Sequence, residues 1–110
     1  MGSIGVRRGM AALLLAASLA LSAAPALAAE FTVVLDKMKF GELPESVKPG
    51  DTIVWRNDDI FRHTATARDK SFDVDLPAHS EARMIVGAPG TVEFFCRFHP
   101  GMTGKLVIAP

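Results

Sequence analysis

Short apolar runs alternate with turn-forming residues along the chain from Glu30 onward. Runs of four to eight residues with alternating or β-branched apolar positions are typical of strands, and proline, glycine, asparagine and aspartate mark the turns between them. No stretch after Glu30 keeps a helical period, so we expect an all-β fold without a substantial helix. The pattern predicts strands at 31–35, 38–40, 46–48, 52–56, 63–67, 71–74, 81–86, 91–95 and 105–108.

The same alternation predicts which side chains form the core. Ile53 and Trp55 share one face of the strand at 52–56, because successive side chains of a strand point to opposite faces. We interpret Trp55 as a core residue rather than a redox relay. Met38 and Met84 are expected in the core as well, since methionine fills irregular apolar gaps. A chain of this size buries only a modest core, so a bound metal would add to its stability.

The N-terminal segment has the pattern of a cleaved export signal peptide. Arg7 and Arg8 precede an apolar stretch at 10–21, and small residues at 26–28 form a cleavage motif. We predict removal of residues 1–28, leaving 29–110 as a single domain in the periplasm or otherwise exported. The arginine pair fits the general secretory route and also the twin-arginine route. The apolar stretch is short for a membrane span, so we expect no stable membrane insertion after cleavage.

Charge and cysteine content narrow the function classes. The chain has twelve basic and twelve acidic residues, and loss of Arg7 and Arg8 leaves a formal charge of −2. This balance provides no basic field for nucleic acid, and we expect a monomer. Cys96 is the only cysteine, so it has no internal disulfide partner, although export would place it where disulfides persist. An unpaired thiol there is well suited to holding a metal.

The loop that contains this cysteine carries a metal-binding pattern. Cys96 is followed by His99 and Met102, and His63 is the candidate for a fourth ligand. Thiolate, imidazole and thioether together suit copper, and a weak axial methionine tunes its potential. The alternative interpretation is a buried cysteine, a turn histidine and a core methionine, which would need three coincidences within seven residues. The loop therefore predicts a copper site.

Three stretches together resemble the cupredoxins, the small blue-copper proteins, over nearly the whole predicted mature chain. They are residues 47–59, residues 63–66 and the loop at 96–102, whose Cys-x-x-His-x-x-Met spacing is similar to that of amicyanins within the amicyanin, plastocyanin and pseudoazurin group. The resemblance implies a Greek-key β-sandwich of about seven to eight strands and one type 1 copper ion. It further implies that His63, Cys96 and His99 are strong ligands and Met102 a weak axial one.

The chain departs from amicyanins beside two of these ligands. Amicyanins usually have asparagine after the first histidine and threonine after the cysteine, whereas this chain has Thr64 and Arg97. The sequence therefore leaves open which residues support the ligands. The polar run at 57–59 either hydrogen-bonds across loops to hold His63 or simply forms a turn. His79 is expected in a surface turn.

The resemblance implies an electron carrier that is not an enzyme. Single electrons would pass through an exposed His99, surrounded by an apolar patch including Pro100 and Met102, to transient partners such as a periplasmic dehydrogenase, a cytochrome c or an oxidase. The alternative is a periplasmic copper carrier or chaperone that delivers copper to an exported oxidase. A hydrolase built on Cys96 and His99 lacks an evident third catalytic group. Four arginines either steer an acidic partner or form ordinary solvated surface: Arg56, Arg62, Arg68 and Arg97.

Overall fold

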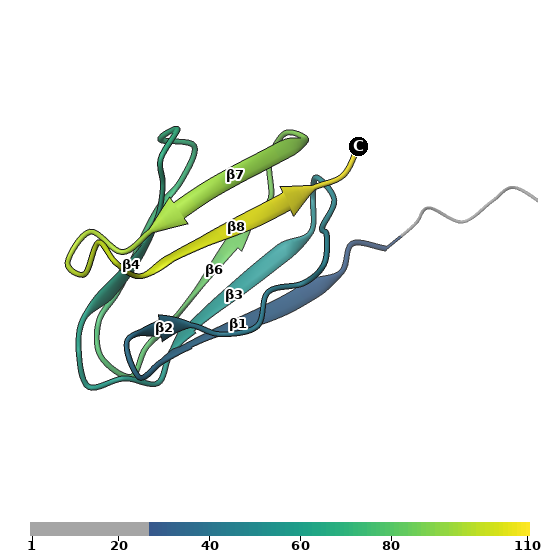
Figure 1. The fold of residues 1–110 in the computed structure, drawn as a ribbon. Coiled ribbons are helices and arrows are strands. Elements are labelled where there is room, and N and C mark those ends of the chain that lie inside the picture. The colour runs from purple at the N-terminus through teal and green to yellow at the C-terminus, as the bar shows by residue number, and fades with distance from the viewer. Residues whose placement is uncertain (1–26) are drawn as a thin grey trace, which may run out of the picture.

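Eight strands form two stacked sheets in the computed structural model, which describes residues 27–110 (Figure 1). The predicted export signal therefore lies almost wholly outside the described residues and stays a prediction. One sheet has the order β2-β1-β3-β6 and the other β5-β4-β7-β8. The bounds are β1 Glu30–Asp36, β2 Lys39–Phe40, β3 Thr52–Asn57, β4 His63–Ala67, β5 Asp73–Leu76, β6 Glu81–Ile85, β7 Gly90–Phe95 and β8 Thr103–Ile108.

Strand pairing confirms the predicted all-β sandwich. β1 runs parallel to β3, with Val33 opposite Trp55, and every other pair of neighbours is antiparallel. The pairings of β3 with β6 and of β4 with β7 join strands distant in sequence, as a Greek-key connection requires. Within residues 27–110, no helix is long and apolar enough to cross a membrane.

Trp55 lies at the centre of the core between the two sheets. Its side chain is fully buried, and its ring meets Phe40 and Phe94 edge to face at centroid distances of 6.1 and 5.2 Å. Edge-to-face packing of this kind favours aromatic pairs beyond their buried area. Phe94 in turn lies against Gly104, its partner across the β7–β8 ladder. The core interpretation of Trp55 is confirmed.

Three predicted strands differ clearly from those observed, and the one predicted at 105–108 begins two residues earlier, at Thr103. Residues 46–48 form only one bridge, between Val47 and Ile108, because Pro44 and Pro49 flank them and a proline nitrogen offers no hydrogen. The strand predicted at 71–74 begins two residues later as β5. A tight turn takes up the preceding residues, with Lys70 at a φ of 68° and Ser71 N donating to Asp69 Oδ1.

The prediction for Met38 was wrong. Met38 lies in the turn between β1 and β2 with a φ of 62°, and it is 38% exposed. Alternation along 37–40 hid this turn because two lysines flank the methionine in a strand-like pattern. Met84 does pack against the core, as expected.

Candidate metal centre

The loop between β7 and β8 is folded back on itself by three backbone hydrogen bonds. His99 N donates to Cys96 O at 3.3 Å, and Met102 N donates to His99 O at 2.8 Å. Cys96 N then donates to Met102 O at 3.1 Å, which closes the loop. Residues 96 to 102 therefore form a compact turn whose shape is fixed by its own backbone. Cys96 and Met102 are buried at its two ends, and His99 is half-buried between them.

His63 joins this loop from the other side of the site. It is the first residue of β4 and is fully buried. Its Nδ1 lies 3.8 Å from Cys96 Sγ and 3.1 Å from His99 Nδ1, and Cys96 Sγ lies 3.6 Å from His99 Nδ1. The structure thus brings together three of the four predicted site residues. Cys96 and His99 lie 33 and 36 positions after His63 in the sequence.

The spacing of these donor atoms fits a single metal ion. Sulfur and imidazole nitrogen donors bind such ions at about 2.0 to 2.3 Å, so ligands around one ion lie roughly 3 to 4 Å apart. All three donors fall within 4.8 Å of one another. Two imidazoles and a thiolate also suit zinc, whereas a nearby thioether favours copper. Met102 is buried in the same loop, and its role as the axial ligand stays a prediction.

Asp59 holds His63 in the orientation that a metal needs. His63 Nε2 lies 2.8 Å from Asp59 Oδ2, and Met38 N donates to the same oxygen at 3.0 Å. With the Nε2 hydrogen donated to the carboxylate, the lone pair of Nδ1 faces Cys96. The hydrogen bond from His63 is the main cause that lowers the pKa of Asp59, followed by the bond from the Met38 amide. Asp59 therefore stays an anionic acceptor beside the histidine.

Asn57 secures the segment that carries Asp59. Its Oδ1 accepts a hydrogen bond from Asp59 N at 2.9 Å, and its Nδ2 donates to Phe61 O at 2.8 Å and to Leu76 O at 3.0 Å. The interpretation of residues 57–59 as a hydrogen-bonding brace for His63 is thus confirmed for Asn57 and Asp59. Asp58 instead forms an exposed ion pair with Arg56 at 3.2 Å.

Thr64 and Arg97 support the cysteine despite their departure from the amicyanin pattern. Thr64 N lies 3.3 Å from Cys96 Sγ and donates to it. Arg97 N donates to Thr64 Oγ1 at 2.9 Å, which fastens the start of the loop to β4. A backbone N–H directed at the sulfur stabilises a thiolate, the form in which cysteine binds metal. Sequence reasoning did not find this contact, because it depends on how β4 and the loop meet.

Exposed apolar side chains lie beside His99 in the loop and on the segment whose Phe61 ring contacts it. Ile60 is 72% exposed, Phe61 48% and Phe98 46%, and the Phe61 ring meets the His99 imidazole edge to face at 6.1 Å. Pro100 is also exposed. We call these four residues the apolar rim: Ile60, Phe61, Phe98 and Pro100. Of the three clustered donors, only the His99 imidazole reaches this surface, because His63 and Cys96 are fully buried.

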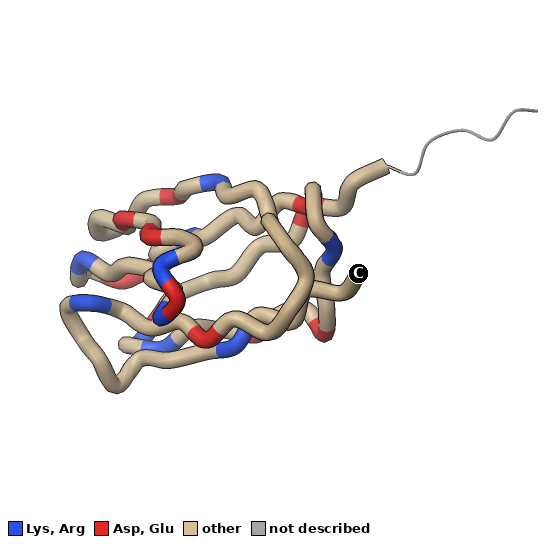
Figure 2. Tube along the Cα trace, turned by 90° about the horizontal axis from the view of Figure 1, so that it is seen from above, with Lys and Arg blue, Asp and Glu red and all other residues tan. Residues whose placement is uncertain are grey.

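Arginines near the apolar rim are paired rather than free. Arg62 forms a two-pronged contact with Asp75 at 2.9 and 2.8 Å, and Arg97 contacts Asp73 at 3.1 Å. The guanidinium groups of both arginines also stack over the Phe98 ring, at 5.1 and 5.6 Å from its centroid. Lys and Arg positions are interspersed with Asp and Glu positions along the chain trace (Figure 2). The structure therefore favours ordinary surface pairing over an arginine field that steers an acidic partner.

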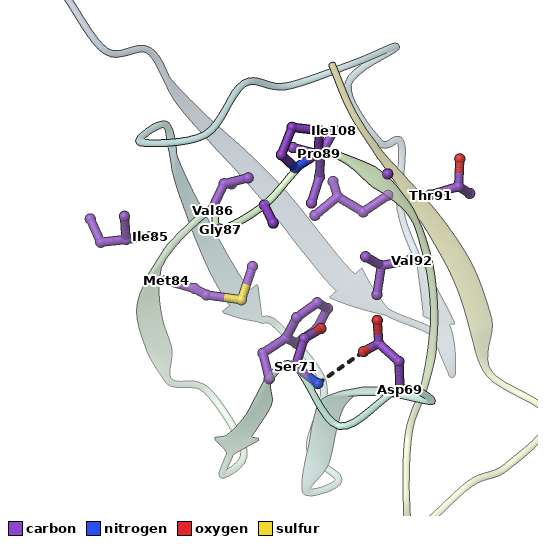
Figure 3. A pocket seen from close by; sticks show the side chains of 14 residues that line it. Asp69, Ser71, Met84, Ile85, Val86, Gly87, Pro89, Thr91, Val92 and Ile108 are labelled. Carbon is purple, nitrogen blue, oxygen red and sulfur yellow. Dashed lines mark hydrogen bonds between the residues drawn. The ribbon is translucent and has the colours of Figure 1, made fainter. Parts of the chain in front are cut away.

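A cavity of about 260 Å³ lies elsewhere, where β6 passes to β7 (Figure 3). Its lining is largely apolar and includes Met84, Val86 and Val92, with Asp69 on one side held by the Ser71 amide. None of its lining residues belongs to the metal cluster. The Cys96 and His99 pair therefore does not open into this cavity, which counts against a hydrolase built on that pair.

Comparison with known proteins gives a consistent result. The family model described as "Cupredoxin-like domain" matches residues 9–108. The chain is 32% identical over 104 residues to amicyanin-alpha of Methylorubrum extorquens, covering 89% of this chain and 86% of that protein. It is 26% identical over 82 residues to amicyanin of Paracoccus versutus, covering 69% of this chain but only 62% of that relative.

A solved structure supports the same assignment of the fold. The Cu(I) form of an amicyanin variant superposes with a TM-score of 0.60 at 26% identity, covering 72% of this chain and 81% of that one. The resemblance predicted from the loop spacing and the strand pattern is thereby confirmed. The expectation that this chain is not an enzyme agrees with its amicyanin relatives.

Proposed function

This chain belongs to the cupredoxin family, and we propose that it is an exported, amicyanin-like electron carrier with one type 1 copper ion. The observation that carries the proposal is the convergence of Cys96 Sγ with the Nδ1 atoms of His63 and His99, at separations of 3.1 to 3.8 Å. These three atoms would be the strong ligands, and the Met102 thioether would be the weak axial one. When bound, copper supplies the one-electron change between its two oxidation states.

The protein's own contribution is to keep the donor atoms in place. Asp59 orients His63, Thr64 N donates to the sulfur, and the backbone bonds of the loop fix His99. Ligands that are already positioned need little rearrangement when the charge of the ion changes. Such a site favours rapid electron transfer, because donor atoms that are already fixed move little when the ion gains or loses an electron.

Electrons would leave the site through His99. Its imidazole is half-buried within the apolar rim, while the other donors are shielded from solvent. A small apolar contact supports a weak and brief encounter, which an electron carrier needs for turnover. We propose transient partners such as a periplasmic dehydrogenase, a cytochrome c or an oxidase. Because the nearby arginines are paired with aspartates, association should depend only weakly on salt.

A copper carrier or chaperone is the alternative that the partial exposure of His99 favours, since an exposed ligand can be exchanged for one from an acceptor. The two functions differ in how firmly copper is retained. An electron carrier keeps its ion through many redox cycles, whereas a chaperone releases it to an acceptor.

Retention of copper during redox cycling tests this proposal. The domain at 29–110 would be loaded with cupric copper and cycled with a reductant and an oxidant in the presence of a cuprous chelator. We expect copper to stay bound and the thiolate-to-copper absorption to return after each cycle. Transfer to the chelator on first reduction would favour copper delivery. Cys96→Ser is the control, since it should abolish the absorption while leaving the β-sandwich folded.

A further inference from the structure

A closed ring of hydrogen bonds begins and ends on Arg97. Arg97 N donates to Thr64 Oγ1 at 2.9 Å, and Thr64 Oγ1 lies 2.8 Å from Thr66 Oγ1. Thr66 Oγ1 donates to Asp73 Oδ1 at 2.7 Å, and Arg97 Nε donates to the same carboxylate oxygen at 3.1 Å. The ring joins β4, β5 and the first residue after Cys96. We call these four residues the Arg97 ring: Thr64, Thr66, Asp73 and Arg97.

The direction of every bond in the Arg97 ring follows from its carboxylate. The hydrogen bond from Thr66 is the main cause that lowers the pKa of Asp73, and Arg97 lowers it further, so Asp73 is an acceptor only. The Thr66 hydroxyl must then give its hydrogen to Asp73, and its oxygen is free to accept the hydroxyl hydrogen of Thr64. Thr64 Oγ1 in turn keeps a lone pair for Arg97 N–H. Each donor therefore has one matched acceptor, and successive bonds polarise one another.

The Arg97 ring connects β4 to the loop beyond the last pair of the β4–β7 ladder. The β4–β7 ladder contains only the pairs of Thr66 with Phe95 and Ala67 with Phe94, so the strands separate just before the metal cluster. Beyond that point, Thr64 links β4 to the loop through its N–H, which donates to Cys96 Sγ, and through its hydroxyl, which accepts from Arg97 N. The neighbours of both bonded groups are metal-site residues, since His63 precedes Thr64 and Cys96 precedes Arg97. A hydrogen bond from the loop backbone to a β4 side chain therefore joins the two segments beside the metal cluster.

We propose that Thr64, Thr66 and Asp73 are positioning residues that fix Cys96 Sγ relative to the His63 imidazole. Their role at copper rests on the proposed function, whereas their clamp on the loop belongs to the metal-free protein. Thr64 acts most directly, because its own N–H also donates to the sulfur at 3.3 Å. Thr66 and Asp73 act through it by holding its hydroxyl in the accepting orientation. An acidic residue on the outer face of β5 therefore helps to set the environment of a buried thiolate.

Substitutions remote from the ligands test this proposal. Thr66→Val removes the hydroxyl that links Thr64 to Asp73, with little change in volume. Asp73→Ala removes the carboxylate that accepts hydrogen bonds from Thr66 and Arg97. In the metal-free protein, we expect each to speed amide hydrogen exchange at Arg97 by about fivefold, the order that one net hydrogen bond supplies. In the copper-loaded protein, each should shift the thiolate-to-copper absorption and the reduction potential. Asp75→Ala is the matched control, because Asp75 lies on the same strand but pairs with Arg62 outside the ring.

A double variant makes the test sharper. If the four residues act as one unit, Thr66→Val combined with Asp73→Ala should change the exchange at Arg97 no more than either alone. Additive effects, unchanged exchange in both single variants, or an equal change in Asp75→Ala would overturn the proposal. The exchange measurement needs no metal, so it separates this inference from the proposed function. If wild-type protein bound no redox-active copper, the proposed function would fail and the clamp would still be measurable.

Discussion

The carboxylate of Asp59 lies 2.8 Å from Nε2 of His63, on the side of the imidazole away from the cysteine sulfur. This contact assigns the two ring nitrogens different tasks, one anchored to the protein and the other directed at the metal cluster. Asp59 also accepts a hydrogen bond from Met38 N, so the β1–β2 turn is attached to the same anchor. The geometry of the candidate ligand therefore depends on a residue outside the Cys-x-x-His-x-x-Met loop.

Replacement of Asp59 by alanine should weaken metal binding. Loss of the anchor frees the imidazole to rotate, and partners of this kind typically contribute roughly 10- to 100-fold to metal affinity. Competition with a chelator of known affinity measures the change. Asp58→Ala serves as the control, because Asp58 is exposed and pairs only with Arg56. Equal copper affinity in the Asp59→Ala and wild-type proteins would mean that His63 needs no such anchor.

Replacement of Met102 by leucine should change the reduction potential while copper stays bound. The axial thioether tunes the ion without holding it, and leucine fills a similar volume in the buried end of the loop. Voltammetry of the copper-loaded variant measures the potential, and metal analysis measures its copper content. Complete loss of copper would show that Met102 is a strong ligand or that the loop has collapsed.

Replacement of Gly104 by alanine should destabilise the fold. A Cβ at this position would lie 2.4 Å from the Phe94 ring, in the packed centre of the sandwich. Overpacking of this kind typically costs about 1 to 3 kcal/mol. Urea unfolding of the metal-free protein provides the measurement. Gly87→Ala is the matched control, since a Cβ there meets nothing within 4 Å, and similar losses in both variants would contradict the packing argument.

Replacement of Asp51 by asparagine should reduce the amount of folding stability that the protein loses as the pH falls. Hydrogen bonds from Ala29 N and then Lys48 N lower the pKa of Asp51 below its usual value of 3.8. A lowered carboxyl pKa adds stability that is present above the unfolded value and is lost as the pH falls through the folded value. The variant should therefore be less stable than wild type at neutral pH. Urea midpoints should converge below pH 3.8, and a constant gap would contradict this assignment.

Much of the fold follows from local patterns in the sequence. Alternation placed the strands around Trp55 and Met84 correctly, because their apolar faces are buried by the opposite sheet. It failed at Met38, where a positive φ puts the side chain on a turn, and at residues 46–48, where flanking prolines leave only one bridge. Those errors have one cause: period-two patterning does not distinguish a short strand from a turn of the same length.

The candidate site was less fully predictable than the fold. Spacing within one loop predicted Cys96, His99 and Met102 as ligands. His63, on a different strand, was the candidate for the fourth ligand, and the resemblance implied the same. The roles of Thr64 and Arg97 were not predictable, because their contact depends on where the β4–β7 ladder ends. Asp59 was recognised only as one of three polar candidates, since its bond to His63 depends on the path of the loop after β3.

The most direct test of the central claim is the visible spectrum of the copper-loaded domain through one cycle of reduction and reoxidation. A copper-thiolate site built on Cys96 and the two histidines should give an intense charge-transfer absorption that bleaches on reduction and returns in full. The band should be missing from the Cys96→Ser protein. Copper bound without that absorption, or an absorption that fails to return because the ion is lost, would contradict an electron-carrying type 1 site in this chain.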